Sequence, residues 1–123
     1  MLQLSHKKLD LYQISLKLVK EIYNVTKQFP TEERFLIVNQ VRRAAISVCS
    51  NLAEGSARKS RQEKIRFFEI SRSSAVEIDT QFEISLILQY VQNEQIAQLE
   101  QYLESVFRMI SKLISNLESG QQH

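Results

Sequence analysis

The chain contains few of the residues that build turns. Its 123 residues include only two glycines and one proline, whereas an all-β protein needs many of both. Long uninterrupted helical segments must therefore dominate, and the composition predicts an all-α fold. A hydrophobic fraction of 43% and a charged fraction of 24% are typical of a soluble globular protein. This length suits one domain with a single core.

Cysteine and histidine are equally scarce. The single cysteine, Cys49, cannot form an internal disulfide, which fits a reducing cytoplasm. The two histidines, His6 and His123, stand near the chain ends, so no base is placed to activate a nucleophile. Zinc and iron–sulfur sites need several Cys or His ligands, and two glycines cannot build a phosphate-binding loop. The sequence therefore predicts no catalytic, metal or cofactor site, and no enzyme activity.

Long apolar runs are absent as well. No run approaches the roughly 18 apolar residues that span a bilayer. The segment from Met1 to Lys8 lacks a continuous apolar core and a cleavage site of small residues, so a secretory signal is not expected. These features predict a cytoplasmic protein with no membrane partner.

Four helices are predicted by apolar residues that recur at three- and four-residue steps. We expect them over residues 5–28, 32–54, 61–91 and 94–117. A heptad pattern like that of the last segment could form a free coiled coil, but four amphipathic segments with short connections favour an antiparallel up-down four-helix bundle. The predicted organisation is one bundle domain over residues 1–118 and a flexible C-terminal tail over residues 119–123.

Capping residues predict where these helices begin and end. Pro30 stops the first helix because the residue before a proline is pushed out of the helical region. Thr31 fits the N-cap of the second helix, and Gly55 fits a left-handed position just after its end. Ser60, with a glutamate three residues later, forms a capping-box pattern for the third helix. Asn93 fits the cap of the fourth.

The predicted second helix carries an aligned polar stripe beside its apolar face. Successive residues advance by about 100° around a helix, which aligns the polar residues Gln40, Arg43, Ser47, Asn51, Glu54 and Arg58. A second stripe, on the third helix, includes Glu77 and Gln81. The stripes could line a binding groove, or they could form a structural polar network that fixes helix register and includes Gly55. Glu54 and Glu77 would serve an enzyme only within a substrate pocket.

Charge is distributed unevenly, although the net charge is only +2. Residues 42–72 carry a charge of +5, whereas residues 73–123 carry −5. The candidate nucleic-acid-binding residues are Arg42, Arg43, Arg58, Lys59, Arg61, Lys64 and Arg66. Basic side chains at a loop and helix start can contact phosphates, but they can equally form a solvated face or a subunit contact. No aromatic residues interleave with them, so base stacking is not expected.

Several apolar residues lie away from the main core stripes. They are Ile46 and Ala53 on the second predicted helix and Ile65, Val76 and Ile87 on the third. A soluble monomer rarely exposes several aligned aliphatic side chains. We therefore expect the chain to assemble with copies of itself, although a wide intramolecular contact face would account for some of these residues.

Several segments together carry a family resemblance. They are Phe29-Pro30, Gln40-Val-Arg-Arg-Ala-Ala45, Ser47-Val48, Asn51-Leu-Ala-Glu-Gly55, Arg58 and Glu77-Ile-Asp-Thr-Gln81. This pattern resembles the "four helix bundle protein" family, first noticed as products of intervening sequences within bacterial 23S ribosomal RNA genes. The match covers residues 9 to 117. The family often has Trp where Tyr12 stands and Gly-Ser where Ser73-Ser74 stands.

The resemblance implies a fold, an assembly and a set of partners. Its helices would run up and down, and its subunits would form a ring-shaped homopentamer. Related proteins of diversity-generating retroelements are accessory subunits that bind a reverse transcriptase and nucleic acid through a basic surface more strongly charged than this chain. The resemblance thus implies a non-enzymatic binding or scaffold protein whose partners are its own copies, RNA or DNA, and an enzyme such as a reverse transcriptase. The alternative is a protein–protein interaction module without a nucleic-acid role.

Overall fold

Residues 1–120 fold into four long helices joined by short connections. The computed structural model describes residues 1–120, so part of the predicted tail, residues 121–123, lies outside the described residues. The helices are α1 (Asp10–Thr26), α2 (Ile37–Ala57), α3 (Arg61–Ile87) and α4 (Ala97–Glu118), and the short turns are η1 (Ser5–Lys8), η2 (Thr31–Glu33) and η3 (Asn93–Ile96). Residues 1–120 contain no strand. The predicted all-α fold is confirmed.

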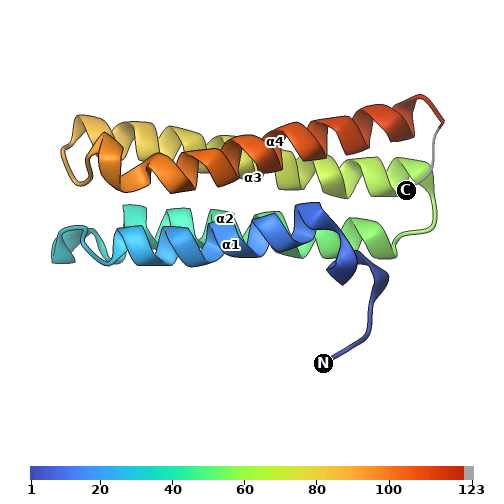
Figure 1. Cartoon of the computed structure of the whole chain (residues 1–123), viewed down its shortest axis with the longest axis horizontal. Coiled ribbons are helices and arrows are strands. Elements are labelled where there is room, and N and C mark those ends of the chain that lie inside the picture. Colours follow the sequence, from blue (N-terminus) through green and yellow to red (C-terminus); the bar gives the residue numbers. More distant parts are fainter. Residues whose placement is uncertain (121–123) are drawn as a thin grey trace.

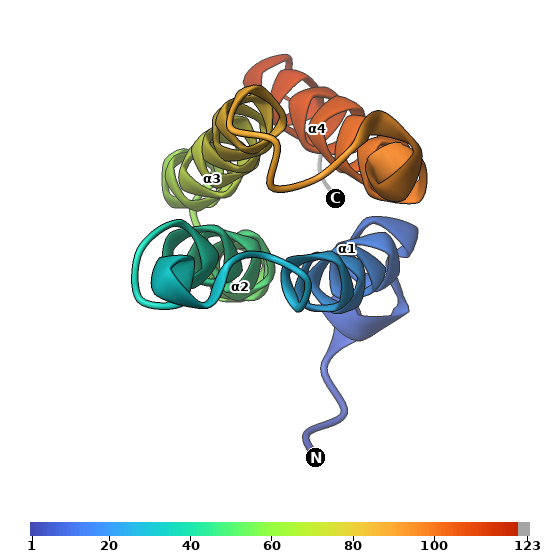
Figure 2. The same ribbon diagram turned by 90° about the vertical axis from the view of Figure 1, so that its left-hand side faces the viewer.

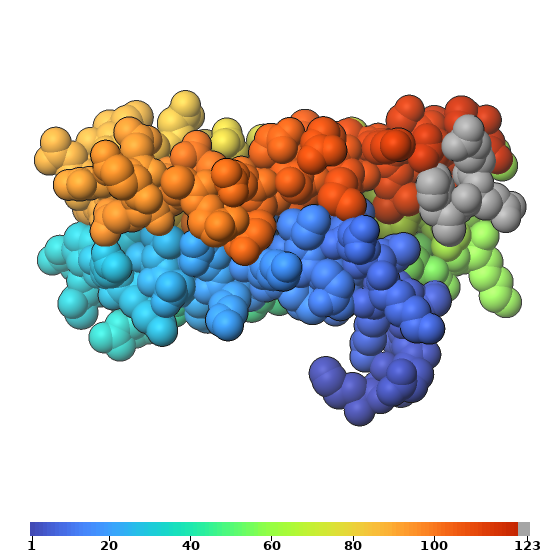
Figure 3. Space-filling view, in the orientation of Figure 1, coloured from blue at the N-terminus to red at the C-terminus, as the bar shows by residue number. Residues whose placement is uncertain are grey.

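The helices form an antiparallel up-down bundle. Figure 1 shows that consecutive helices run in alternate directions along the long axis. Seen along that axis, α1 lies beside α2 and α4, while α3 lies beside α2 and α4, around a shared core (Figure 2). Side chains close the space between α1 and α4 along the bundle, and the N-terminal residues project away from it (Figure 3). The predicted four-helix bundle is therefore confirmed.

Apolar stripes from all four helices form the core. Fully buried side chains come from each helix: Leu18 and Ile22, Val41 and Val48, Ile78, and Leu99, Val106 and Ile110. Each such side chain contributes about 1.5–3 kcal/mol relative to an exposed one. The three- and four-residue spacing places these side chains on one face of each helix, and their burial holds the four helices together.

The helix ends confirm one predicted cap and correct two. The Ser60 Oγ accepts a hydrogen bond from the backbone N–H of Glu63 at 3.1 Å, so Ser60 caps α3 as predicted. Thr31 begins the short turn η2, and α2 starts only at Ile37 without a side-chain cap. Gln92, rather than Asn93, is the N-cap of η3: its backbone N–H donates to Oε1 of Gln95 at 2.8 Å, and the N–H of Gln95 donates to the carbonyl of Gln92.

Helix α3 ends at Ile87, short of the predicted residue 91. Gln89 adopts a left-handed conformation with φ of 63°. The N–H of Gln89 donates to the carbonyl of Leu86, and the N–H of Tyr90 donates to that of Ser85. This pair of bonds is the Schellman motif, which terminates a helix by satisfying its last carbonyl groups.

Gly55 lies inside α2, which continues to Ala57. A Cβ atom at Gly55 would lie 2.6 Å from Cε1 of Phe68 and 3.1 Å from Cβ of Phe67, both on α3. Glycine is therefore required because α2 and α3 approach each other closely here. The predicted left-handed position at a helix end is wrong for Gly55. The glycine with a positive φ is Gly120, at 90°, after α4.

Candidate functional site

The polar stripe of α2 meets the stripe of α3 through serine side chains. The Ser74 Oγ donates to the Ser47 Oγ at 2.9 Å, and the Ser71 Oγ donates to the carbonyl of Val48 at 2.8 Å. Asn51 extends this network within α2, since its Nδ2 donates to the carbonyl and to the Oγ of Ser47. These contacts favour the structural interpretation of the stripes, because the hydroxyl groups of Ser71 and Ser74 find hydrogen-bond partners on the neighbouring helix.

The remaining stripe residues face outward or pair along their own helix. Gln40 is exposed at the α2 surface. Glu54 forms an ion pair with Arg58 at 3.1 Å. On α3, the Nε2 of buried Gln81 donates to the carboxylate of exposed Glu77 at 3.4 Å. Each carboxylate thus interacts with the residue four positions further along its own helix, an arrangement that supports helix stability.

The candidate nucleic-acid-binding residues do not form one patch. Arg42 and Arg43 lie in the first half of α2, whereas Arg58 follows its end. The helical rise places Arg42 and Arg58 about 24 Å apart. The five residues Arg58, Lys59, Arg61, Lys64 and Arg66 surround the α2–α3 connection, and we call this group the basic end.

Arg42 connects α2 to α1. Its Nε donates to Oγ1 of Thr26 at 3.0 Å, and its Nη2 donates to the carbonyl of Tyr23 at 3.3 Å. Its guanidinium also lies 4.4 Å from the centre of the Tyr23 ring, a cation–π distance. Arg43, the next residue, is exposed on the outer side of α2. The two arginines therefore belong to different surfaces of the bundle.

Several cations of the basic end hold local structure. Besides its ion pair, Arg58 lies 4.6 Å from the centre of the Phe67 ring. Lys64 donates to the carbonyl of Ser56 at 3.2 Å, and Arg61 donates to that of Gly120 at 3.4 Å. Lys59 and Arg66 are exposed at the same end. The basic end thus combines cations that organise the helix connection with cations that face solvent.

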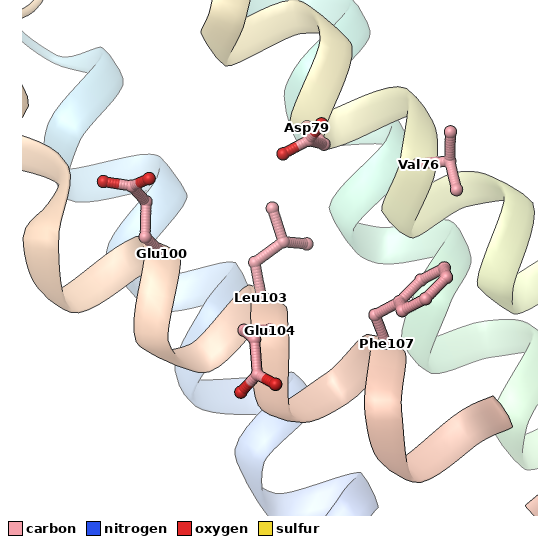
Figure 4. Close-up of a pocket in the computed structure, with 6 residues that line it drawn as sticks. All are labelled: Val76, Asp79, Glu100, Leu103, Glu104 and Phe107. Carbon is pink, nitrogen blue, oxygen red and sulfur yellow. The ribbon is translucent and has the colours of Figure 1, made fainter. Parts of the chain in front are cut away.

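Helices α3 and α4 enclose a shallow groove with an apolar floor and carboxylates at its rim. Its volume is about 320 Å³, and Figure 4 shows its lining residues: Val76, Asp79, Glu100, Leu103, Glu104 and Phe107. We call this the acidic groove. Val76 is 50% exposed and Phe107 is 44% exposed. The sequence pattern marks Val76 as an apolar residue outside the core stripe but does not distinguish Phe107, and the acid-rich composition of residues 73–123 is the signal for the carboxylates at the rim.

The apolar residues expected outside the core have two different environments. Ile46, Val76 and Ile87 are exposed. Ala53 and Ile65 are half-buried, and Ile65 packs against the core. For Ile65 the wide intramolecular face is therefore the correct explanation. Two further apolar side chains, Phe35 and Leu36 before α2, are exposed and were not predicted from the sequence.

Cys49 and the acidic residues form no site for redox or metal chemistry in the described part of the chain. Burial raises the pKa of the Cys49 thiol to about 11, so the reactive thiolate is scarce at neutral pH. Residues 1–120 contain no group of three or more His, Cys, Asp or Glu side chains that could hold a metal ion. None of the helices in this range is both long enough and apolar enough to cross a membrane.

The fold and these surfaces define a four-helix-bundle protein, and nothing in the described residues indicates catalysis. The sequence profile of the 23S rRNA-intervening sequence protein family matches residues 7–112. The chain belongs to this family, which confirms the resemblance seen in the sequence.

A solved structure has the same fold. It is the crystal structure of a protein of unknown function from the S23 ribosomal protein family of Bacteroides thetaiotaomicron. The TM-score is 0.77 at 22% sequence identity, over 85% of this chain and 97% of that chain. At this identity the likeness establishes the fold alone. A search of curated proteins finds no match to this chain.

Proposed function

We propose that the protein is a non-enzymatic cytoplasmic scaffold that assembles with copies of itself. The acidic groove is the observation that carries this proposal, because two large apolar side chains in it, Val76 and Phe107, are about half exposed to solvent. Covering large apolar side chains stabilises a complex by about 1.5–3 kcal/mol for each one fully buried. Carboxylates at the rim then select a basic partner surface.

The outer side of α2 offers such a surface on the same chain. Arg43 and Ile46 on α2 and Leu36 immediately before it are exposed, and we call these three residues the outer α2 face. The cation of Arg43 complements the carboxylates of the acidic groove, while the two aliphatic side chains match its apolar floor. Since two different surfaces would meet, the contact is head-to-tail, and a head-to-tail contact closes into a ring when its rotation permits. This supports the ring-shaped homo-oligomer, with five subunits as the resemblance implies.

Two variants test this contact, Ile46→Glu on the outer α2 face and Val76→Glu in the acidic groove. Each introduces a carboxylate at a position that is exposed in the single chain, so folding should change by only about 0.5 kcal/mol. At the contact, a desolvated or like-charged carboxylate should weaken self-association by about 100-fold or more. Sedimentation velocity over a range of protein concentrations measures the effect.

Mixing the two variants makes the test specific. Each variant retains one intact surface, so an equimolar mixture should form a heterodimer that cannot grow further. Leu16→Glu is the matched control, because Leu16 is exposed on α1 and belongs to neither surface. The proposed contact would be contradicted if the parent protein stays monomeric at a concentration about 10 times a micromolar dissociation constant. It would also be contradicted if the mixture of the two variants stays monomeric.

A second candidate function is RNA binding at the basic end, with a reverse transcriptase or another RNA-handling enzyme as a further partner. Exposed Lys59 and Arg66 favour it, since side chains of this kind neutralise phosphates and release counterions. DNA would satisfy the same contacts. The protein–protein module without a nucleic-acid role remains the competing interpretation.

Filter binding with a structured RNA at several salt concentrations separates these two interpretations. If Lys59 and Arg66 contact phosphates, the double variant Lys59→Gln/Arg66→Gln should lower the slope of log affinity against log salt by about 2. Lys17→Gln/Lys20→Gln on exposed positions of α1 is the matched control. Binding that does not change with salt would rule out phosphate contacts and leave the protein–protein module.

A further inference from the structure

We propose that the pocket between the end of α1 and the start of α2 binds a phosphate group. The pocket has a volume of about 200 Å³, and three cationic side chains, Lys27, Arg34 and Arg42, belong to its lining. None of its lining residues is acidic. The α1–α2 connection lies at the opposite end of the bundle from the basic end (Figure 1), so this site is separate from the candidate RNA-binding surface.

Arg42 is held in a fixed orientation beside this pocket. Thr26 and Tyr23 accept hydrogen bonds from two of its N–H groups, and the Tyr23 ring supports its guanidinium. A guanidinium carries five N–H donors, so these contacts leave further donors for a ligand. Neither ion pair found within residues 1–120 includes Arg42, which is half-buried. A partly desolvated cation without a carboxylate partner attracts an anion strongly.

The walls of the pocket are fixed by packing against α3 and the α3–α4 connection. The Phe29 ring lies 6.2 Å from that of Phe82 and 5.7 Å from that of Tyr90. The Tyr90 hydroxyl donates to Oε1 of Glu33 at 2.8 Å. This hydrogen bond raises the pKa of Tyr90 above its usual value and engages the carboxylate of Glu33 outside the pocket lining. The cations therefore surround a cavity that is already formed.

The chemistry of the lining favours phosphate over other anions. Arginine matches the oxygens of phosphate through parallel N–H···O bonds, and lysine adds a point charge. The hydroxyl group of exposed Thr31 supplies a further donor in the same lining, whereas the Thr26 hydroxyl already donates to the carbonyl of Ile22 and serves to hold Arg42. A phosphate monoester carries two negative charges on three terminal oxygens, so it matches three cations better than a carboxylate, which carries one negative charge. Inorganic phosphate, a nucleotide and the 5′ end of an RNA all share this chemistry.

Titration of the full chain with inorganic phosphate, adenosine 5′-monophosphate and adenosine tests the site. Amide chemical shifts in NMR spectra should change in a saturable way at Thr26 and Thr31 with both phosphates and remain unchanged with adenosine. Arg34→Gln should weaken phosphate binding by about tenfold or more, since it removes a charged hydrogen-bond donor. Arg34 is exposed, so this change leaves the Arg42 contacts intact. Lys20→Gln, on exposed α1, is the matched control.

A pair of short RNAs with the same sequence identifies the source of the phosphate. Tighter binding of the 5′-phosphorylated RNA than of the 5′-hydroxyl RNA, lost in Arg34→Gln, would support the site and assign it to an RNA end. Equal binding of the two RNAs, together with saturable phosphate binding, would support it as a small-molecule site. The proposal is overturned if phosphate produces no saturable change, or if Arg34→Gln and Lys27→Gln both bind phosphate like the parent protein. The assembly variants at Ile46 and Val76 do not alter the pocket, so the two proposals can fail independently.

Discussion

Gly55→Val is expected to lower the free energy of unfolding by about 2–3 kcal/mol, in the upper part of the range for overpacked cores. The first added carbon would already lie 2.6 Å and 2.8 Å from two atoms of the Phe68 ring. Phe68 is only 3% exposed, so its ring has no free space to enter. Valine has a slightly higher helix propensity than glycine, but this difference stabilises the helix by only about 0.4 kcal/mol. The steric cost therefore decides the sign.

Urea denaturation measures this loss, and a matched control isolates its cause. Ser50→Val introduces the same side chain at an exposed position of α2, where only helix propensity changes. Phe68→Leu removes the ring that the new side chain would meet, so Gly55→Val should cost less in that background, a coupling that a double-mutant cycle measures. If Gly55→Val and Ser50→Val are equally stable, the close approach of α2 and α3 at Gly55 is wrong.

The four helices could be predicted from sequence because apolar residues recur at three- and four-residue steps, most clearly in α1, α2 and α4. The pattern is weaker in α3, which also carries exposed apolar residues outside its core stripe. The details that failed depend on contacts between segments. Gly55 fits a helix end equally well when only its neighbours are considered, and its contact with Phe68 exists only once α2 and α3 are packed. The N-cap of α3 was predicted correctly because the bond that Ser60 accepts comes from Glu63, only three positions away, so a short stretch of sequence contains both residues.

The candidate site shows the same limit. The sequence aligned Ser47 and Asn51 on one stripe, but the hydrogen bond from Ser74 to Ser47 requires the register of two helices. Consecutive Arg42 and Arg43 look like one basic pair in the sequence, yet Arg42 contacts α1 while Arg43 faces solvent. The acidic groove likewise joins residues of two helices, so composition could indicate its charge but not its shape.

Ile110→Ala is expected to lower the free energy of unfolding by about 2–5 kcal/mol, the usual cost of removing a fully buried aliphatic side chain. Ile110 is fully buried on α4, where it meets the other core stripes. Phe107→Ala, one helical turn away, is the matched comparison because Phe107 is 44% exposed. In the single chain it should cost about 1 kcal/mol, less than Ile110→Ala, because nearly half of the side chain is already in contact with water.

These two variants separate folding from assembly within one helix. Urea denaturation at low protein concentration reports the stability of the single chain, whereas sedimentation reports association. Ile110→Ala should mainly lower the stability measured by urea denaturation. Phe107→Ala should mainly weaken self-association, by about tenfold or more, because the acidic groove loses its largest apolar side chain.

If assembly also stabilises the fold, the unfolding midpoint of the parent protein will rise with protein concentration, and Phe107→Ala will abolish that rise. A concentration-independent midpoint with unchanged sedimentation in Phe107→Ala would assign both residues to the fold alone and remove the groove from the assembly contact.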